Sequence, residues 1–158
     1  MRPGKFKVLF VCTGNQCRSP MAEGLLKEKL FEKDYTDIEV GSAGTMTIVG
    51  VPPAQNSIVA MQEVDIDIGD QTSSTITPSL IEEADLILTM EAAHSAYIRR
   101  LWPESADKVH NLRAYDDGVD EDVADPVGMD LEAYRTCRDI LKMEIDRIIE
   151  SIISLSRK

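Results

Sequence analysis

The feature that most constrains the fold is a strand, a short loop and a helix in immediate succession near the start of the chain. The run from Val8 to Val11 is continuously apolar, which is typical of a strand covered on both faces. A polar loop begins at Cys12, and apolar residues then recur at helical spacing from about Ser19 to Lys33. We expect Ser19 to be the N-cap of this helix, with Pro20 in its first turn.

Strands and helices continue to alternate along the rest of the chain. The predicted strands are 38–43, 86–90 and 109–112, and the predicted helices are 52–61, 78–83, 92–101 and 134–152. Such alternation implies parallel strands with helices on both sides of the sheet. The sequence therefore predicts an α/β fold, a three-layer α/β/α arrangement with a four-stranded parallel sheet, formed as a single domain over residues 1–158.

Charge and composition limit the partners and the compartment. A net charge of −11 argues against nucleic acid and against anionic lipid, because both attract a basic surface. No run approaches the roughly 18 apolar residues that span a membrane. Three cysteines do not make a disulfide framework. We expect a cytoplasmic protein that binds neither nucleic acid nor membrane, and the sequence leaves its oligomeric state open.

The loop after the first strand has the residues of an anion-binding site. Ligands of parallel α/β sheets bind at the carboxyl ends of the strands, where Cys12 lies. A loop that enters a helix directs backbone N–H groups and the helix dipole at one small hollow. Gly14 and Asn15 tolerate positive φ, and Arg18 can bind two phosphate oxygens at once. The same positive surroundings favour the thiolate of Cys12, and Ser19 is close enough to donate a hydrogen bond to it.

These residue types point to phosphoryl transfer through a covalent intermediate. A thiolate beneath an anion cradle can attack phosphorus in line and accept the phosphoryl group. Arg18 and the loop amides would neutralise the equatorial oxygens, so the predicted reaction uses no metal and no other cofactor. The predicted phosphate-binding residues are Thr13, Gly14, Asn15, Gln16, Cys17 and Arg18.

Several stretches of the chain resemble the low-molecular-weight protein tyrosine phosphatase family, including its bacterial branches and their protein arginine phosphatases. The main one is Cys-x5-Arg-Ser after the first strand, followed by Pro-Met-Ala-Glu; the others are 42–44, 84–90 and 124–126. The resemblance implies that Cys12 is the nucleophile, that Arg18 binds the phosphoryl group and that Asp125 is the general acid. It also implies that Ser42 supports the loop through Asn15, and that the partner is a phosphorylated protein.

The other candidate residues have competing interpretations. Pro126 restricts Asp125 to an extended backbone, which helps to project a carboxyl that can protonate a leaving group and later activate water. Cys17 either forms the reversible disulfide with Cys12 that the resemblance allows or fills the underside of the loop. The two histidines, His94 and His110, are expected to have surface or packing roles, and Cys137 is expected in the core.

Departures from the family pattern leave the substrate open. Val127 stands where members that cleave phosphotyrosine usually have an aromatic residue, Gln71 replaces a histidine, and Gln16 is polar. Hydrolysis of phosphotyrosine in proteins is the leading hypothesis, and hydrolysis of protein phosphoarginine is the nearest alternative. A thioredoxin-coupled arsenate reductase is disfavoured because residues 65–80 contain no cysteine. A phosphate carrier or binding module is disfavoured because Arg18 and Asp125 are both present.

Overall fold

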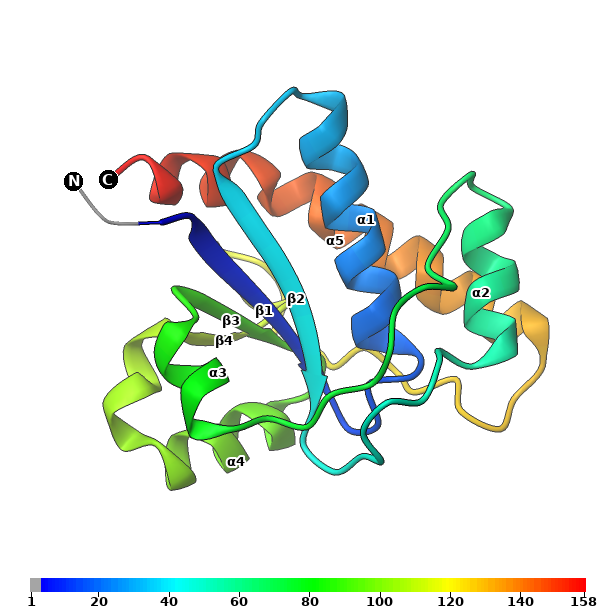
Figure 1. Ribbon diagram of the computed structural model, residues 1–158, viewed down its shortest axis with the longest axis horizontal. Helices are drawn as coiled ribbons and strands as arrows, with labels where there is room; N and C mark the ends of the chain where they lie inside the picture. The colour runs from blue at the N-terminus through cyan, green and yellow to red at the C-terminus, as the bar shows by residue number, and fades with distance from the viewer. Residues whose placement is uncertain (1–3) are drawn as a thin grey trace.

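Four parallel strands form the centre of the protein, of which the computed structural model describes residues 4–158 (Figure 1). The strands are β1 (Phe6–Cys12), β2 (Ile38–Gly44), β3 (Leu86–Thr89) and β4 (Val109–Asn111). Their order across the sheet is β2-β1-β3-β4, and each neighbouring pair is parallel. The predicted parallel sheet is therefore confirmed.

Helices cover both faces of this sheet, which confirms the three layers (Figure 1). They are α1 (Arg18–Glu32), α2 (Gln55–Gln62), α3 (Pro78–Glu83), α4 (Ala92–Leu101) and α5 (Leu131–Ser156). The 3₁₀ helix Pro103–Lys108, which precedes β4, was not predicted. No helix within residues 4–158 is long and apolar enough to cross a membrane.

The start of α1 differs from the expectation. Its N-cap is Cys17, and no side chain caps the helix. Ser19 lies inside the first turn, so its prediction as the N-cap was wrong. The hydroxyl of Ser19 instead lies 2.9 Å from the Cys12 sulfur and accepts a hydrogen bond from Asn15. The first amides of α1 are thereby left without a side-chain cap, as an anion-binding helix terminus requires.

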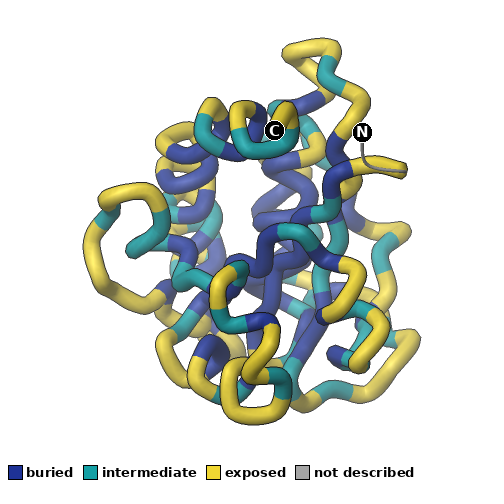
Figure 2. Tube along the Cα trace, turned by 90° about the vertical axis from the view of Figure 1, so that its left-hand side faces the viewer, coloured by how far each residue is buried: buried dark blue, intermediate teal, exposed yellow. Residues whose placement is uncertain are grey.

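The central strand β1 supplies both layers of the core. Phe6, Val8 and Phe10 pack on the side of α1 and α5, whereas Leu9 and Val11 pack on the side of α3 and α4. Burial of one such side chain stabilises the fold by about 1.5–3 kcal/mol. Figure 2 shows the buried segments gathered at the centre and the exposed ones in the outer loops and turns. The apolar run predicted from the sequence is thus covered on both faces.

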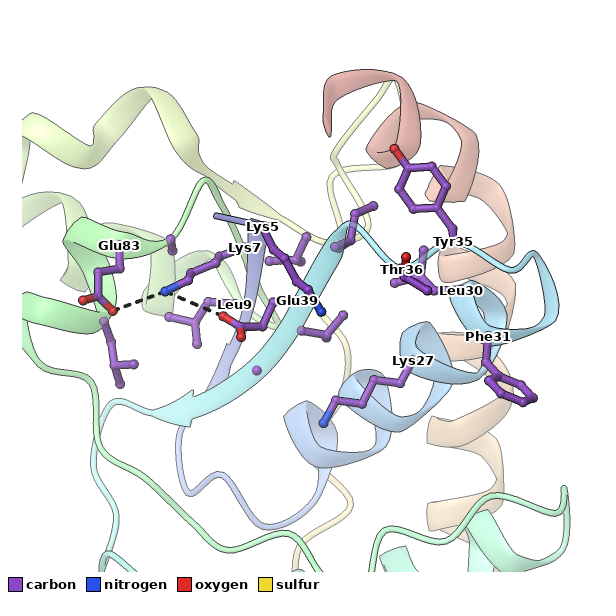
Figure 3. A pocket seen from close by; sticks show the side chains of 16 residues that line it. Lys5, Lys7, Leu9, Lys27, Leu30, Phe31, Tyr35, Thr36, Glu39 and Glu83 are labelled. Carbon is purple, nitrogen blue, oxygen red and sulfur yellow. Dashed lines mark ion pairs between the residues drawn. The ribbon is translucent and has the colours of Figure 1, made fainter. Parts of the chain in front are cut away.

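The free edge of β2 borders a hollow of about 700 Å³ (Figure 3). This hollow lies beside the N-terminal half of β1, at the opposite end of the strand from Cys12. The Nζ atom of Lys7 lies 3.6 Å from carboxylate oxygens of both Glu39 and Glu83. Charged side chains beside an unpaired strand edge oppose pairing with another chain, so we attribute these charges to edge protection.

Candidate active site

The loop between β1 and α1 closes around the thiol of Cys12. The backbone N–H of Asn15 donates to Cys12 Sγ at 3.2 Å, and Ser19 Oγ lies 2.9 Å from the same sulfur. Asn15, rather than Gly14, adopts the left-handed conformation, with φ of 54°. The thiol is thus surrounded by donors at the carboxyl end of the central strand.

The carbonyl groups of this loop are bonded to groups outside it. Four of them accept hydrogen bonds: Cys12 from Thr45 N at 2.9 Å, Thr13 from Met46 N at 3.0 Å, Gly14 from Thr47 Oγ1, and Gln16 from Ala54 N at 2.9 Å. In a trans peptide the N–H points away from the C=O. The amide that follows each of these carbonyls is therefore turned toward the hollow, which is the arrangement of an oxyanion cradle.

The end of β2 makes a close contact with this loop. A Cβ atom on Gly44 would lie 2.6 Å from the Thr13 carbonyl oxygen and 3.1 Å from the Asn15 nitrogen. Gly44 is also the register partner of Cys12 in the β1–β2 pair. Glycine at this position therefore lets the loop lie directly against the strand.

Asn15 is the centre of the hydrogen-bond network that supports the loop. Its Nδ2 atom donates to Ser19 Oγ at 2.8 Å and to Ser42 Oγ at 3.0 Å, and its Oδ1 accepts the Ser74 N–H at 2.8 Å. Ser42 in turn donates to Glu23 Oε1 at 2.6 Å. The structure therefore contains the contact between Ser42 and Asn15 that the resemblance implied. It adds Glu23 and Ser74, which the sequence analysis did not identify.

Arg18 is held rigidly in the base of the site, with its side chain only 1% exposed. Its Nη1 donates to Glu91 Oε2 at 2.5 Å and to the Val123 carbonyl at 2.8 Å. Within residues 4–158, Nε of Arg18 is one of two buried side-chain nitrogen or oxygen atoms without a hydrogen-bond partner. A buried donor without an acceptor costs free energy, and a phosphoryl oxygen would supply that acceptor.

Asp125 lies across the hollow from the loop. Its Oδ2 is 3.3 Å from Nη2 of Arg18, and its Oδ1 accepts the Val127 N–H at 3.1 Å. The hollow measures about 50 Å³ and is lined by Cys12, Gly14, Gln16, Cys17, Arg18, Asp125 and Val127. The structure therefore brings the three predicted catalytic residues together from distant parts of the chain.

His94 also lies beside this site, where it is buried, so the packing role is confirmed and the surface role is not. The side chain is 5% exposed, and its Nε2 lies 2.9 Å from Thr13 Oγ1. Glu91 and His94 follow β3 at the same edge of the sheet as Cys12. Their place directly after a predicted strand could have indicated that they lie near Cys12, because the carboxyl ends of parallel strands meet at one edge of the sheet.

The remaining cysteines lie behind the loop or within the core. All three cysteines are free thiols, and Cys137 is buried in the core as predicted. Cys17 Sγ lies 3.5 Å from the Tyr134 hydroxyl, and burial raises the pKa of the Cys17 thiol. Gln71 donates to the Pro20 carbonyl, and it is the backbone N–H of Ser74 that donates to Asn15 Oδ1.

A parallel α/β sheet with a thiol, a buried arginine and a carboxylate around an amide cradle defines a cysteine-dependent phosphatase. The sequence model of the family described as low molecular weight phosphotyrosine protein phosphatase matches residues 7–157. The chain belongs to this family.

Three relatives illustrate the range of the family. A Protein-arginine-phosphatase from Geobacillus stearothermophilus is 37% identical over 147 residues, covering 93% of this chain and 96% of that protein. Arsenate reductase 1 from Bacillus cereus is also 37% identical over 147 residues, with the same coverage of 93% and 96%. The crystal structure of a low molecular weight protein tyrosine phosphatase from T. tengcongensis superposes with a TM-score of 0.88 at 36% identity, covering 93% of this chain and 99% of that one.

Proposed function

We propose that this protein removes phosphoryl groups from side chains of phosphorylated proteins through a cysteinyl-phosphate intermediate. The observation that carries the proposal is the buried guanidinium of Arg18 beside the thiol of Cys12, because its Nε has no acceptor among the residues that the structure describes. An anion with several acceptor oxygens complements this donor and the loop amides at the same time. The enzyme would act in the cytoplasm, with residues 1–158 as one catalytic domain.

The proposed reaction has two steps that use the same residues. In the first, the Cys12 thiolate attacks phosphorus and the sulfur–phosphorus bond forms. The bond to the leaving atom, oxygen in phosphotyrosine or nitrogen in phosphoarginine, breaks as Asp125 protonates that atom. In the second, water attacks phosphorus and gives a proton to Asp125, and the sulfur–phosphorus bond breaks. Inorganic phosphate leaves, and the thiolate is restored. Arg18 and the loop amides stabilise the equatorial oxygens in both steps.

Phosphotyrosine is the first substrate that we propose, in line with the family to which the chain belongs. Protein phosphoarginine is the second candidate, favoured by the lining of the hollow. Gln16 and Val127 line it, and no aromatic ring lines it in the part of the chain that the structure describes. A polar Gln16 side chain can accept an N–H of a guanidinium leaving group, whereas stacking on a phenyl ring would need an aromatic wall.

The test compares two peptides that differ only in phosphotyrosine or phosphoarginine, with a chelator present. We expect the wild-type protein to hydrolyse at least one of them, and the peptide with the higher kcat/KM identifies the substrate class. Cys12→Ser should abolish turnover while phosphate binding persists. Wild-type protein that turns over neither peptide would contradict the proposal.

Two further measurements distinguish this phosphatase from a phosphate carrier and from a thioredoxin-coupled arsenate reductase. Rapid quenching should trap a phosphorylated wild-type protein that then hydrolyses in water, whereas a carrier would retain the phosphoryl group until an acceptor is added. Reduction of arsenate coupled to thioredoxin should be absent. An arsenate reductase of that type needs a resolving cysteine pair, and residues 65–80 contain no cysteine.

A further inference from the structure

His94 lies between Thr13 of the phosphate-binding loop and Glu91, the residue that binds Arg18. Its Nε2 is 2.9 Å from Thr13 Oγ1, and its Nδ1 accepts the backbone N–H of Glu91 at 3.2 Å. A ring nitrogen that accepts an N–H carries no proton. In the neutral ring the proton therefore sits on Nε2 and is donated to Thr13.

Glu91 connects this ring to the guanidinium of Arg18. Glu91 is the N-cap of α4, and its side chain accepts the backbone N–H of His94 while the His94 ring accepts the backbone N–H of Glu91. The same carboxylate accepts the 2.5 Å hydrogen bond from Arg18 Nη1. A change in the reciprocal cap therefore reaches the carboxylate that orients Arg18.

We propose that His94 is a positioning residue for phosphoryl transfer, which fixes the first peptide of the loop relative to the Arg18 guanidinium through Thr13 and Glu91. The inference rests on the phosphatase activity proposed above. His94 acts through these two residues and does not itself touch the reacting phosphoryl group. Its role is to keep the cradle and the arginine at the spacing that the transition state requires.

The ring performs this role in its neutral form. The charged groups that face it are Arg18 of α1, Glu91 at the start of α4, and Asp122 and Asp125 of the loop before α5. Burial and then the charge of Arg18 lower the pKa of His94 below its ordinary value of 6.5. Protonation of Nδ1 would make it a donor that faces the backbone N–H of Glu91, which is also a donor, and the hydrogen bond between them would break. Activity should therefore decline as the pH falls through the lowered pKa of His94.

The first test is a double-mutant cycle on the bond between His94 and Thr13. His94→Asn retains an acceptor near the position of Nδ1 but cannot reach Thr13, and Thr13→Val removes the acceptor at nearly constant shape. We expect kcat on the better phosphopeptide to fall about 10- to 100-fold in each single variant, with KM changed less than about threefold. The kcat of the double variant should be no more than about twofold below that of the less active single variant, because both substitutions remove the same bond.

The second test is the pH profile of kcat/KM for the wild type, His94→Asn and a matched control. His110→Asn is the control, because His110 lies on β4 with its ring 5.0 Å from that of Tyr115 and outside the site. The acid limb due to His94 should be lost in His94→Asn and kept in His110→Asn. An acid limb unchanged in His94→Asn would overturn the proposal.

Other outcomes separate this proposal from the phosphatase activity itself. Losses that multiply in the double variant would overturn the role of His94 while leaving the activity in place. Wild-type protein inactive on every phosphopeptide would instead contradict the activity. Thr13 is exposed, so Thr13→Val tests the bond even if His94→Asn fails to fold, and wild-type kcat in Thr13→Val would refute the proposal.

Discussion

At the residue scale, the site depends on polar side chains that are buried and almost fully bonded. Asn15 is 3% exposed, yet both its amide hydrogens and its oxygen have partners. Arg18 is the exception, because its Nε has no partner within residues 4–158. Hydrogen bonds hold these side chains in place, and the unpaired Nε of Arg18 lies where a phosphoryl oxygen is needed.

Substitution of Asp125 should have an effect that depends on the leaving group. Asp125→Asn removes the acidic proton but keeps the shape of the side chain. We expect kcat to fall about 10²–10⁴-fold for a phosphopeptide with a poor leaving group, and far less for an activated aryl phosphate. Steady-state kinetics on the two substrates measure the difference. The control Asp120→Asn changes an exposed carboxylate of the same loop and should keep both rates. Equal losses on both substrates in Asp125→Asn would contradict the acid role.

At the element scale, β2 both borders the sheet and shapes the loop. Its N-terminal part borders the hollow of about 700 Å³ that Lys7, Glu39 and Glu83 line. Its last residue, Gly44, lies against the backbone of the phosphate-binding loop. The segment 45–47 that follows then bonds to loop carbonyls. One strand thus supplies an edge of the fold and the outer support of the cradle.

Two glycines of β2 should respond differently to alanine. In Gly44→Ala the new Cβ would meet the Thr13 carbonyl at 2.6 Å, whereas in Gly41→Ala the nearest atom, Leu9 Cδ1, would be 3.9 Å away. We expect Gly44→Ala to lower kcat/KM by about tenfold or more, because a small displacement of the cradle is costly. Gly41→Ala should stay within about twofold of the wild type. Similar activities in the two variants would show that the loop tolerates displacement.

At the scale of the whole molecule, the fold buries groups that would otherwise titrate near neutral pH. Burial lowers the pKa of both histidines, His94 and His110, below the ordinary value of 6.5. As the pH falls below 6.5, the unfolded chain binds protons that the folded protein does not. The folded state is therefore destabilised on the acid side, progressively until the lowered pKa values are reached.

The free energy of unfolding should therefore fall between pH 7 and pH 5. Each histidine contributes a slope of up to about 1.4 kcal/mol per pH unit in this window. Urea titrations at pH 7, 6 and 5 measure it. The double variant His94→Asn/His110→Asn should show a flatter dependence than the wild type, whatever its stability at pH 7. A variant slope as steep as that of the wild type would assign the pH dependence to other groups.

The sequence by itself determined the fold class and indicated the candidate catalytic residues Cys12, Arg18 and Asp125, which the structure brings together around one hollow. The alternation of strands and helices depends on local periodicity, and the loop from Cys12 to Arg18 is contiguous, so both are readable along the chain. Asp125 was identifiable as the candidate general acid because Pro126 follows it within a stretch that resembles the family.

Only the tertiary structure decided how the loop is supported and oriented. Glu23, Ser74, Glu91 and His94 reach the site from separate elements, and bonds between such distant residues leave no local pattern in the sequence. The prediction of Ser19 as the N-cap was wrong for the same reason, whereas its predicted contact with the Cys12 sulfur is present. Its hydroxyl bonds to Cys12 and to Asn15 rather than to the helix terminus. Local propensity sets where a helix forms, whereas a buried polar atom bonds to whatever partner the packing brings within reach.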